Sequence, residues 1–246
     1  MKGIILAGGM GSRLAPLTQS DNKHFLPVYQ RRMIEYPINT LTSAGITDVV
    51  LITGGRRPGV FLEYLKDGSK FGIERLYYTH QEGAGGIPAA LKLAKPFLEP
   101  GESCAVILGD NYFEDGIANG LTEWNKTRVG AHIFLKEVDV PFIFGIAQVD
   151  KKTGKVIHLE EKPKVPRSNL AILGGYVFDN KVWEYIESLE PSARGELEIT
   201  GLLECYMHNG TLGYSTYSGY WNDMGSFESW MEVSKRVCGL CKECQS

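Results

Sequence analysis

The first 27 residues constrain the fold of this chain more than any other stretch. An apolar run over residues 3–7 breaks into Gly8-Gly9-Met10-Gly11-Ser12-Arg13, which is typical of a buried strand leading into a glycine-rich loop. Glycine backbones can adopt positive φ and bring several N–H donors against an anion. We therefore expect a phosphate-binding loop, with charge added by Arg13 and Lys23. A tight strand-to-helix connection would explain the glycines equally well.

Glycine spacing and net charge argue against two classes of function. The loop differs from G-x-G-x-x-G, and no G-K-[ST] follows it, so neither the dinucleotide fingerprint nor the P-loop fits. The net charge is −3 and the pI is about 6.0, whereas nucleic-acid binders normally carry a basic excess. We expect neither a nicotinamide oxidoreductase nor a nucleic-acid partner.

The pattern predicts a cytoplasmic protein without a membrane partner. No stretch approaches the roughly 20 apolar residues of a membrane span, and the N-terminus leads directly into a strand without a signal-peptide pattern. The five cysteines are an odd number and do not resemble a secreted disulfide framework, so reduced thiols are expected. A metal site on the C-x-x-C-x-x-C of Cys238, Cys241 and Cys244 would lack a fourth ligand.

Strand and helix signals alternate over the first half and predict an α/β fold. The expected strands are 3–7, 48–53, 74–79 and 103–108, and the expected helices are 33–44, a short one ending near Lys66, and 87–97. This is the parallel half of a doubly wound sheet. Strands follow at 131–136, 145–149, 155–161 and 171–178, then helices at 181–188 and 197–208, a strand near 212–218 and a last helix from Ser226. These favour antiparallel or mixed additions. We expect one domain over residues 1–236 and a tail over residues 237–246.

Two aspartates are candidate ligands of a cation. Asp110 follows the apolar run 103–108, so it lies at the carboxyl edge, where open α/β sheets bind ligands. Asp223 lies in the distant segment Trp221-Asn222-Asp223-Met224-Gly225. Mg²⁺ commonly takes one or two protein carboxylates together with phosphate oxygens and water. The alternative for Asp110 is a cap on a following helix.

Two further charged segments are ambiguous on their own. Glu160-Glu161-Lys162-Pro163 follows a strand and could be an ordinary solvated strand end. Residues 191–200, PSARGELEIT, predict a loop that carries Arg194, followed by a helix whose first residues are acidic. The guanidinium of Arg194 suits a phosphate, although an ion pair with Glu196 or Glu198 is the alternative.

Taken together, these motifs resemble those of the sugar-phosphate nucleotidyltransferases, closest to short glucose-1-phosphate thymidylyltransferases. The motifs are G-G-x-G-x-R-L with Lys23 and Leu26-Pro27, the Asp110 segment, E-E-K-P, residues 191–200 and the Asp223 segment. The resemblance implies a Rossmann-like mixed sheet with helices on both faces and an added β-rich sugar-binding portion. It also implies magnesium-dependent transfer of a nucleotidyl group from a triphosphate, with dTTP expected, to glucose 1-phosphate, with release of pyrophosphate.

The resemblance also implies roles for individual residues. Those expected to be catalytic are Arg13, Lys23, Asp110 and Lys162, and those expected to hold Mg²⁺ are Asp110 and Asp223. The expected nucleotide-binding residues are Leu6, Gly8, Gly9, Gly11, Gln81 and Gly86. The expected sugar-phosphate-binding residues are Asn111, Gly145, Glu161, Lys162, Arg194 and Trp221.

Departures from the family pattern concern substrate choice. Pro88-Ala89 replaces a usual Ala-Gln near Gln81, and Phe142-Ile143 replaces a usually polar pair. Uridylyl or cytidylyl transfer to another sugar 1-phosphate is therefore an alternative, as is a catalytically silent sugar-nucleotide-binding regulatory protein. Family analogy favours a homo-oligomer, with a dimer expected. Longer relatives continue into further C-terminal helices, so weak or altered feedback regulation is expected here.

Overall fold

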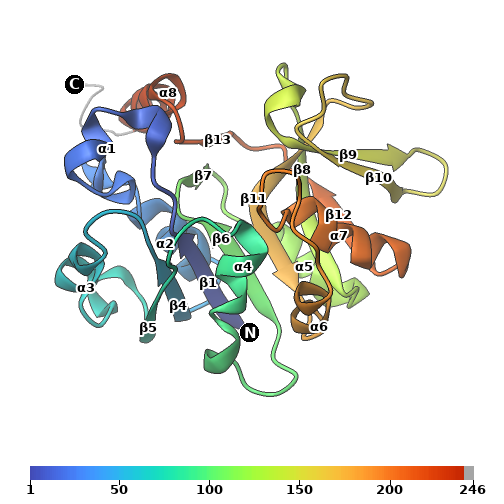
Figure 1. The fold of residues 1–246 in the computed structure, drawn as a ribbon, viewed down its shortest axis with the longest axis horizontal. Helices are drawn as coiled ribbons and strands as arrows, with labels where there is room; N and C mark the ends of the chain where they lie inside the picture. The colour runs from blue at the N-terminus through green and yellow to red at the C-terminus, as the bar shows by residue number, and fades with distance from the viewer. Residues whose placement is uncertain (241–246) are drawn as a thin grey trace. The chain divides into compact units, whose positions relative to one another are not determined.

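The computed structural model describes residues 1–240, whose contacts cluster in two compact units (Figure 1). Unit 1 comprises Met1–Lys2, Gly85–Val106 and Ile117–Ser218, and unit 2 comprises Gly3–Ala84, Ile107–Gly116 and the described residues from Gly219 on. One domain over residues 1–236 stays a prediction. Cys241 and Cys244, which belong to the predicted tail, lie outside the described residues.

The apolar runs of unit 2 form parallel strands. Strand β1 (Lys2–Ala7) pairs in parallel with β4 (Asp48–Thr53), and β4 pairs in parallel with β5 (Arg75–His80); the three lie side by side in Figure 1. Strand β1 is buried along its whole length and β4 over all but its first residue, as continuous apolar runs predict. Helices α2 (Glu35–Thr42) and α3 (Gly59–Leu65) precede and follow β4. The parallel arrangement predicted for the strands at 3–7, 48–53 and 74–79 is confirmed.

The last described helix of unit 2 packs against a cluster of buried apolar side chains. Helix α8 (Phe227–Leu240) buries Val233 in this cluster. Its Trp230 Nε1 donates to the Pro27 carbonyl over 2.8 Å, and Arg236 forms two hydrogen bonds to Glu114 of 2.7 and 2.8 Å. The cluster is Leu14, Leu26, Val28, Met33, Tyr36, Tyr112, Met224 and Val233.

Several short elements of unit 2 were not predicted. Strand β7 (Asn111–Phe113) pairs antiparallel with β13 (Trp221–Asp223). Because β7 directly follows Asp110, the alternative in which Asp110 caps a helix is wrong. The remaining short elements are η1 (Ser12–Leu14), α1 (Leu17–Ser20), η2 (Lys23–Phe25), β2 (Pro27–Val28), β3 (Arg31–Arg32) and η3 (Ser69–Phe71).

Unit 1 contains the predicted mixed strands. Strand β11 (Leu170–Phe178) pairs antiparallel with β8 (Ala131–Glu137) and β9 (Gly145–Asp150), and β9 pairs antiparallel with β10 (Lys155–Glu161). Strand β12 (Leu212–Thr216) lies parallel to β8. All of β11 except its first residue is buried. The first residues of β6 (Cys104–Leu108) also belong to unit 1, and the boundary between the units falls within this strand.

The helices of unit 1 correct three predictions. Helix α4 (Ile87–Lys92) ends before residue 97, because Pro96 lacks an N–H and its ring would crowd the Lys92 carbonyl; only a 3₁₀ turn, η4 (Lys95–Phe97), follows. Helix α7 (Ile199–His208) begins two residues late, because the Leu197 N–H donates to the Gly85 carbonyl. Helix α5 (Ala118–Thr127) was missed. The other elements are η5 (Pro141–Ile143) and α6 (Val182–Glu187).

Candidate functional site

The glycine-rich loop of unit 2 is packed too closely for side chains. A Cβ at Gly8 would come 2.5 Å from Gln81 Oε1, and one at Gly9 would come 2.9 Å from Lys23 Nζ. Gly11 has a φ of 68° and precedes η1, which carries Arg13. The glycines therefore let two predicted functional side chains, Gln81 and Lys23, reach the loop backbone directly.

Lys23 and Asp110 form a largely buried ion pair beside this loop. Lys23 Nζ lies 2.5 Å from Asp110 Oδ2, and the two side chains are 10% and 17% exposed. Asn111 Nδ2 donates to Asp110 Oδ1 over 3.0 Å, and Trp221 Nε1 donates to Asn111 Oδ1 over 2.8 Å. Burial opposes ionisation of Asp110, but Lys23, with smaller contributions from His24 and the Asn111 hydrogen bond, outweighs burial and holds the pKa of this carboxyl well below its usual range.

Asp223 brings a second carboxylate to the same place. It is opposite Asn111 in the β13–β7 register, and the neighbouring Met224 N–H donates to the Asp110 carbonyl over 2.7 Å. Burial and the negative charge of Asp110 raise the pKa of Asp223, while Arg13, whose Nη2 lies 3.9 Å away, lowers it. Unit 2 thus places two carboxylates and two cationic side chains beside the glycine-rich loop.

A second cluster of predicted residues lies in unit 1, at the end of β10. Glu161 is opposite Gly145 in the β10–β9 register, and a Cβ on Gly145 would come 3.2 Å from Glu161 Oε2. This oxygen is buried and has no hydrogen-bond partner among the described residues. Burial raises the pKa of Glu161. The alternative of an ordinary solvated strand end is therefore wrong for Glu161. Lys162 follows with a φ of 45°.

Arg194 also belongs to this cluster, and it is paired with Glu198, the alternative partner from the sequence analysis. Its Nε and Nη2 donate to the two carboxylate oxygens of Glu198 over 3.1 and 2.6 Å. Ser192 Oγ donates to Glu198 Oε1 and accepts from the Arg194 N–H. Arg194 Nη2 also lies 3.6 Å from Glu161 Oε1. The pair with Glu198 is confirmed, and phosphate binding by Arg194 stays a prediction.

The predicted residues divide between the two units. Asn111 and Trp221, which are predicted to bind the sugar phosphate, are hydrogen-bonded to each other in unit 2. Gly86, predicted for the nucleotide, lies in unit 1 with a φ of 88°. The others of unit 2 are Leu6, Gly8, Gly9, Gly11, Arg13, Lys23, Gln81, Asp110 and Asp223, and the others of unit 1 are Gly145, Glu161, Lys162 and Arg194.

Asn22 and His24, which flank Lys23, were missed by sequence reasoning. Both are buried, at 1% exposure each. Burial, together with the charge of Lys23, lowers the pKa of His24 to about 3, so its ring is neutral at physiological pH. The only available signal was a pair of hydrogen-bonding side chains on either side of a lysine expected to be functional.

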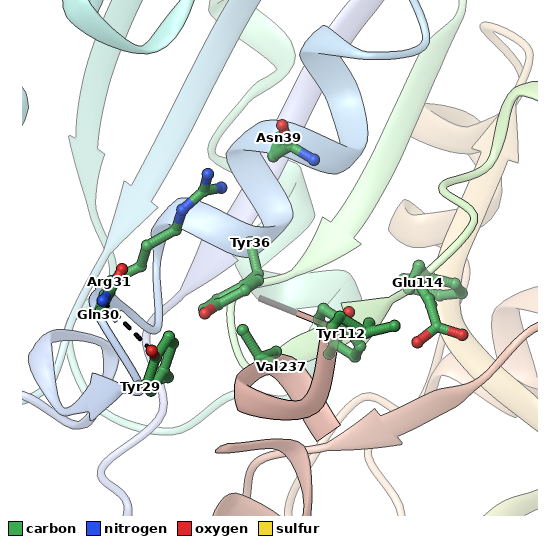
Figure 2. A pocket seen from close by; sticks show the side chains of 10 residues that line it. Tyr29, Gln30, Arg31, Tyr36, Asn39, Tyr112, Glu114 and Val237 are labelled. Carbon is green, nitrogen blue, oxygen red and sulfur yellow. Dashed lines mark hydrogen bonds between the residues drawn. The ribbon is translucent and has the colours of Figure 1, made fainter. Parts of the chain in front are cut away.

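A separate cavity of about 310 Å³ lies in unit 2 (Figure 2). Tyr29, Tyr36 and Tyr112 line it together with Glu114, which Arg236 holds, and Val237 of α8. None of the predicted site residues lines this cavity, so it is distinct from the cluster beside the glycine-rich loop.

The comparisons identify the class of protein. The sequence model of the family described as Nucleotidyl transferase matches residues 2–239, and the chain belongs to this family of nucleotidyltransferases. A relative from Xanthomonas campestris pv. campestris, named glucose-1-phosphate thymidylyltransferase, is 40% identical over 239 residues, or 96% of this chain and 80% of the relative. A protein of the same name from Neisseria gonorrhoeae is 40% identical over 240 residues, with coverages of 96% and 82%.

Solved structures agree with this assignment. A Bacillus anthracis protein, provisionally described as a glucose-1-phosphate thymidylyltransferase and solved in complex with a sucrose, has a TM-score of 0.90 and 43% identity, covering 96% of this chain and 95% of its own. A UDP-glucose pyrophosphorylase complexed with UDP-glucose has a TM-score of 0.86 at 22% identity, covering 98% and 99%, which shows the fold alone. The predicted fold class and family resemblance are confirmed.

No helix within residues 1–240 is long and apolar enough to cross a membrane. No group of three or more His, Cys, Asp or Glu side chains in this part of the chain is arranged around a common metal position. Cys104 and Cys205 are free thiols.

Proposed function

We propose that this protein transfers a nucleotidyl group from dTTP to glucose 1-phosphate, forming a nucleoside-diphosphate sugar and pyrophosphate. The observation that carries the proposal is the arrangement of Lys23, Asp110, Asp223 and Arg13 beside the glycine-rich loop. It combines the anion-binding backbone and the cation-binding carboxylates that a triphosphate substrate requires. The names of the relatives support glucose 1-phosphate and a thymidylyl donor.

The reaction is a direct in-line displacement. A phosphate oxygen of the sugar phosphate forms a bond to the α-phosphorus of the triphosphate, and the bond from that phosphorus to the bridging oxygen of pyrophosphate breaks. Catalysis rests on positioning and charge neutralisation. Arg13, Lys23 and the loop amides hold the departing pyrophosphate, and Lys162 reduces the repulsion between the attacking phosphate and the triphosphate.

Asp110 and Asp223 fit a magnesium ion. They offer oxygen ligands from two segments. After burial, the negative charge of Asp110 is the next cause of the raised pKa of Asp223, so a cation held by both carboxylates would relieve their repulsion. When bound, Mg²⁺ supplies positive charge that polarises the reacting phosphoryl group. Lys23 keeps Asp110 ionised, and Asn111 fixes the orientation of its carboxylate.

The cluster in unit 1 suits a sugar phosphate. The unpartnered Glu161 Oε2 can accept a hydrogen bond from a sugar hydroxyl. A side chain at Gly145 would crowd this oxygen, since a Cβ there would come 3.2 Å from it. Lys162 and Arg194 supply cations for the phosphate. In unit 2, Gln81 is the side chain proposed to read the base. We also propose, by family analogy, that Gly86 and Leu6 contact the nucleotide and that the protein acts as a cytoplasmic homodimer.

Release of pyrophosphate tests this function. The purified protein would be incubated with Mg²⁺ and each of four nucleoside triphosphates against several sugar 1-phosphates. We expect the highest kcat/KM for dTTP with glucose 1-phosphate and none after EDTA treatment. Greater activity with UTP or CTP would instead establish uridylyl or cytidylyl transfer. Nucleotide-sugar binding without turnover for any pair would establish a silent binding protein.

A further inference from the structure

The buried side chain of Asn22 links the turn that carries Lys23 to the loop after β4. Its Nδ2 donates to the carbonyls of Gly54 and Arg56, over 2.9 and 3.0 Å. Its Oδ1 accepts from the backbone N–H of His24 over 3.1 Å and lies 2.9 Å from His24 Nδ1. The two carbonyl acceptors define which end of the carboxamide is the NH₂ group, so Oδ1 faces His24 and His24 Nδ1 must donate.

On one side, this carboxamide fastens the Lys23 turn to the loop after β4. That loop is packed against the glycine-rich loop: a Cβ at Gly54 would come 2.7 Å from Gly8 Cα, and one at Gly55 would come 3.2 Å from the Gly9 carbonyl oxygen. The hydrogen bonds of Asn22 therefore fix the Lys23 turn relative to the backbone that is proposed to bind the triphosphate.

On the other side, Asn22 orients the His24 ring against the segment that carries Asp110. A Cβ on Gly109 would come 2.8 Å from His24 Cδ2 and 2.9 Å from Nε2. The Gly109 N–H is itself bound to the Leu6 carbonyl over 2.9 Å. The imidazole thus packs against Gly109, the residue that precedes Asp110. Asn22 therefore positions Lys23 through its hydrogen bonds to the loop after β4, and it supports the Asp110 segment through the His24 ring.

We propose that Asn22 is a positioning residue for the nucleotidyl transfer, acting by holding Lys23 against Asp110 and beside the glycine-rich loop. The expected effect of Asn22 on turnover rests on the proposed function. The expected movement of Lys23 away from Asp110 when the carboxamide is removed does not depend on that function.

Two variants separate the donor and acceptor ends of the carboxamide. Asn22→Asp keeps the shape and the acceptor for His24 but places a carboxylate against two carbonyl oxygens, whereas Asn22→Ala removes both ends. Since misplacement of about 1 Å can cost roughly 100-fold in rate, we expect kcat to fall about 10- to 100-fold in both. The Kd for the triphosphate should rise, and the Kd for the sugar phosphate should remain near that of the wild type.

A double-mutant cycle distinguishes positioning from general stability. The Kd for dTTP would be measured without sugar phosphate, below the melting temperature of each variant. In a Lys23→Ala background, Asn22→Asp should change this Kd by less than about two-fold, because residues acting through one another are not additive. An equal loss in both backgrounds would refute action through Lys23.

A matched control and a crystal structure complete the test. Thr40 is another buried hydrogen-bonding side chain of unit 2, whose Oγ1 donates to the Tyr36 carbonyl over 3.0 Å. Thr40→Ala should lower Tm and leave kcat unchanged. In crystals of Asn22→Asp, Lys23 Nζ should lie beyond about 3.5 Å from Asp110, outside hydrogen-bond distance. An unmoved pair would overturn the proposal. A wild type inactive with every substrate pair would refute the proposed function, while this structural readout would still decide the role of Asn22.

Discussion

At the scale of single residues, the opposite pKa shifts of Asp110 and Asp223 arise from their different partners. Lys23 stabilises the ionised form of Asp110, whereas at Asp223 burial and the negative charge of Asp110 outweigh the charges of Arg13 and Lys23 and raise the pKa. A divalent cation bound by both carboxylates would offset the repulsion between them. Each aspartate therefore has a distinct testable consequence.

Asp110→Asn and Asp223→Asn should each reduce kcat by about 100-fold or more, because either change removes a negative ligand from the proposed magnesium site. Asp223→Asn should not lower Tm in the absence of metal, since it relieves repulsion between like charges. Turnover and melting curves with and without Mg²⁺ measure both effects. Glu114→Gln is the control: it weakens the bond to Arg236 of α8 and should keep turnover. Near-normal turnover in either aspartate variant would remove that residue from the site.

His132 should make the protein less stable as the pH falls. Burial lowers its pKa to about 4; Nε2 lies 2.8 Å from Ser215 Oγ, and Nδ1 has no partner among the described residues. Between pH 6.5 and 4 the unfolded chain binds the proton and the folded chain does not, so stability declines as the pH falls, by at most roughly 3 kcal/mol from this group.

Urea unfolding between pH 4.5 and 7 checks this. His132→Gln keeps a polar partner for Ser215 but cannot titrate, so its free energy of unfolding should depend less steeply on pH than that of the wild type. His24 acts in the same direction in both proteins, so the difference in slope isolates His132. Identical slopes would show that His132 is not responsible.

At the scale of elements, close packing overrides helix propensity in α5. A Cβ on Gly120 would overlap the ring of Phe134 in β8. Alanine would favour the helix by about 0.5–1 kcal/mol, but overpacking costs about 1–3 kcal/mol. Gly120→Ala should therefore destabilise the protein by roughly 1 to 2 kcal/mol.

Gly201 of α7 provides the matched control in the same unit. A Cβ there would lie 3.7 Å from Leu189 Cδ2, an ordinary van der Waals contact. Gly201→Ala should raise the free energy of unfolding by about 0.5–1 kcal/mol. Chemical denaturation of the wild type and both variants measures the two changes in the free energy of unfolding. If both changes have the same sign, close packing at Gly120 is not the cause.

At the scale of the whole molecule, the proposed substrate contacts are divided between the two units. Lys162, Glu161 and Arg194 belong to unit 1, whereas Arg13, Lys23 and Asp110 belong to unit 2. Lys162→Ala should weaken binding of glucose 1-phosphate more than binding of dTTP, and Arg13→Ala should do the reverse, because each cation faces a different anion. Separate titrations of the two substrates measure this, and equal weakening of both by both variants would contradict the division.

Much of the fold followed from local patterns in the sequence. The strands at β4 and β10 were predicted to the residue, because an apolar or alternating run bounded by turn residues depends little on distant contacts. The end of α4 before Pro96 was also readable from the sequence, and was overlooked. Helix α5, with only Leu121, Trp124 and Gly120 buried, carried too weak a pattern to be noticed.

The candidate site shows where local reasoning stopped. Chemical type and motif spacing were enough to select the loop residues, both aspartates and the lysines, because charge and glycine content can be read directly from the sequence. Their partners could not be selected in this way, since Lys23 and Asp110, or Asn22 and Gly54, are far apart in the sequence and meet only when the strands pair. The sequence alone therefore determined the class of fold and the chemistry available to it. Tertiary packing decided which charges neutralise one another, which carboxylate oxygen at Glu161 lacks a partner, and which carboxamide holds the lysine, because these are properties of distance and burial.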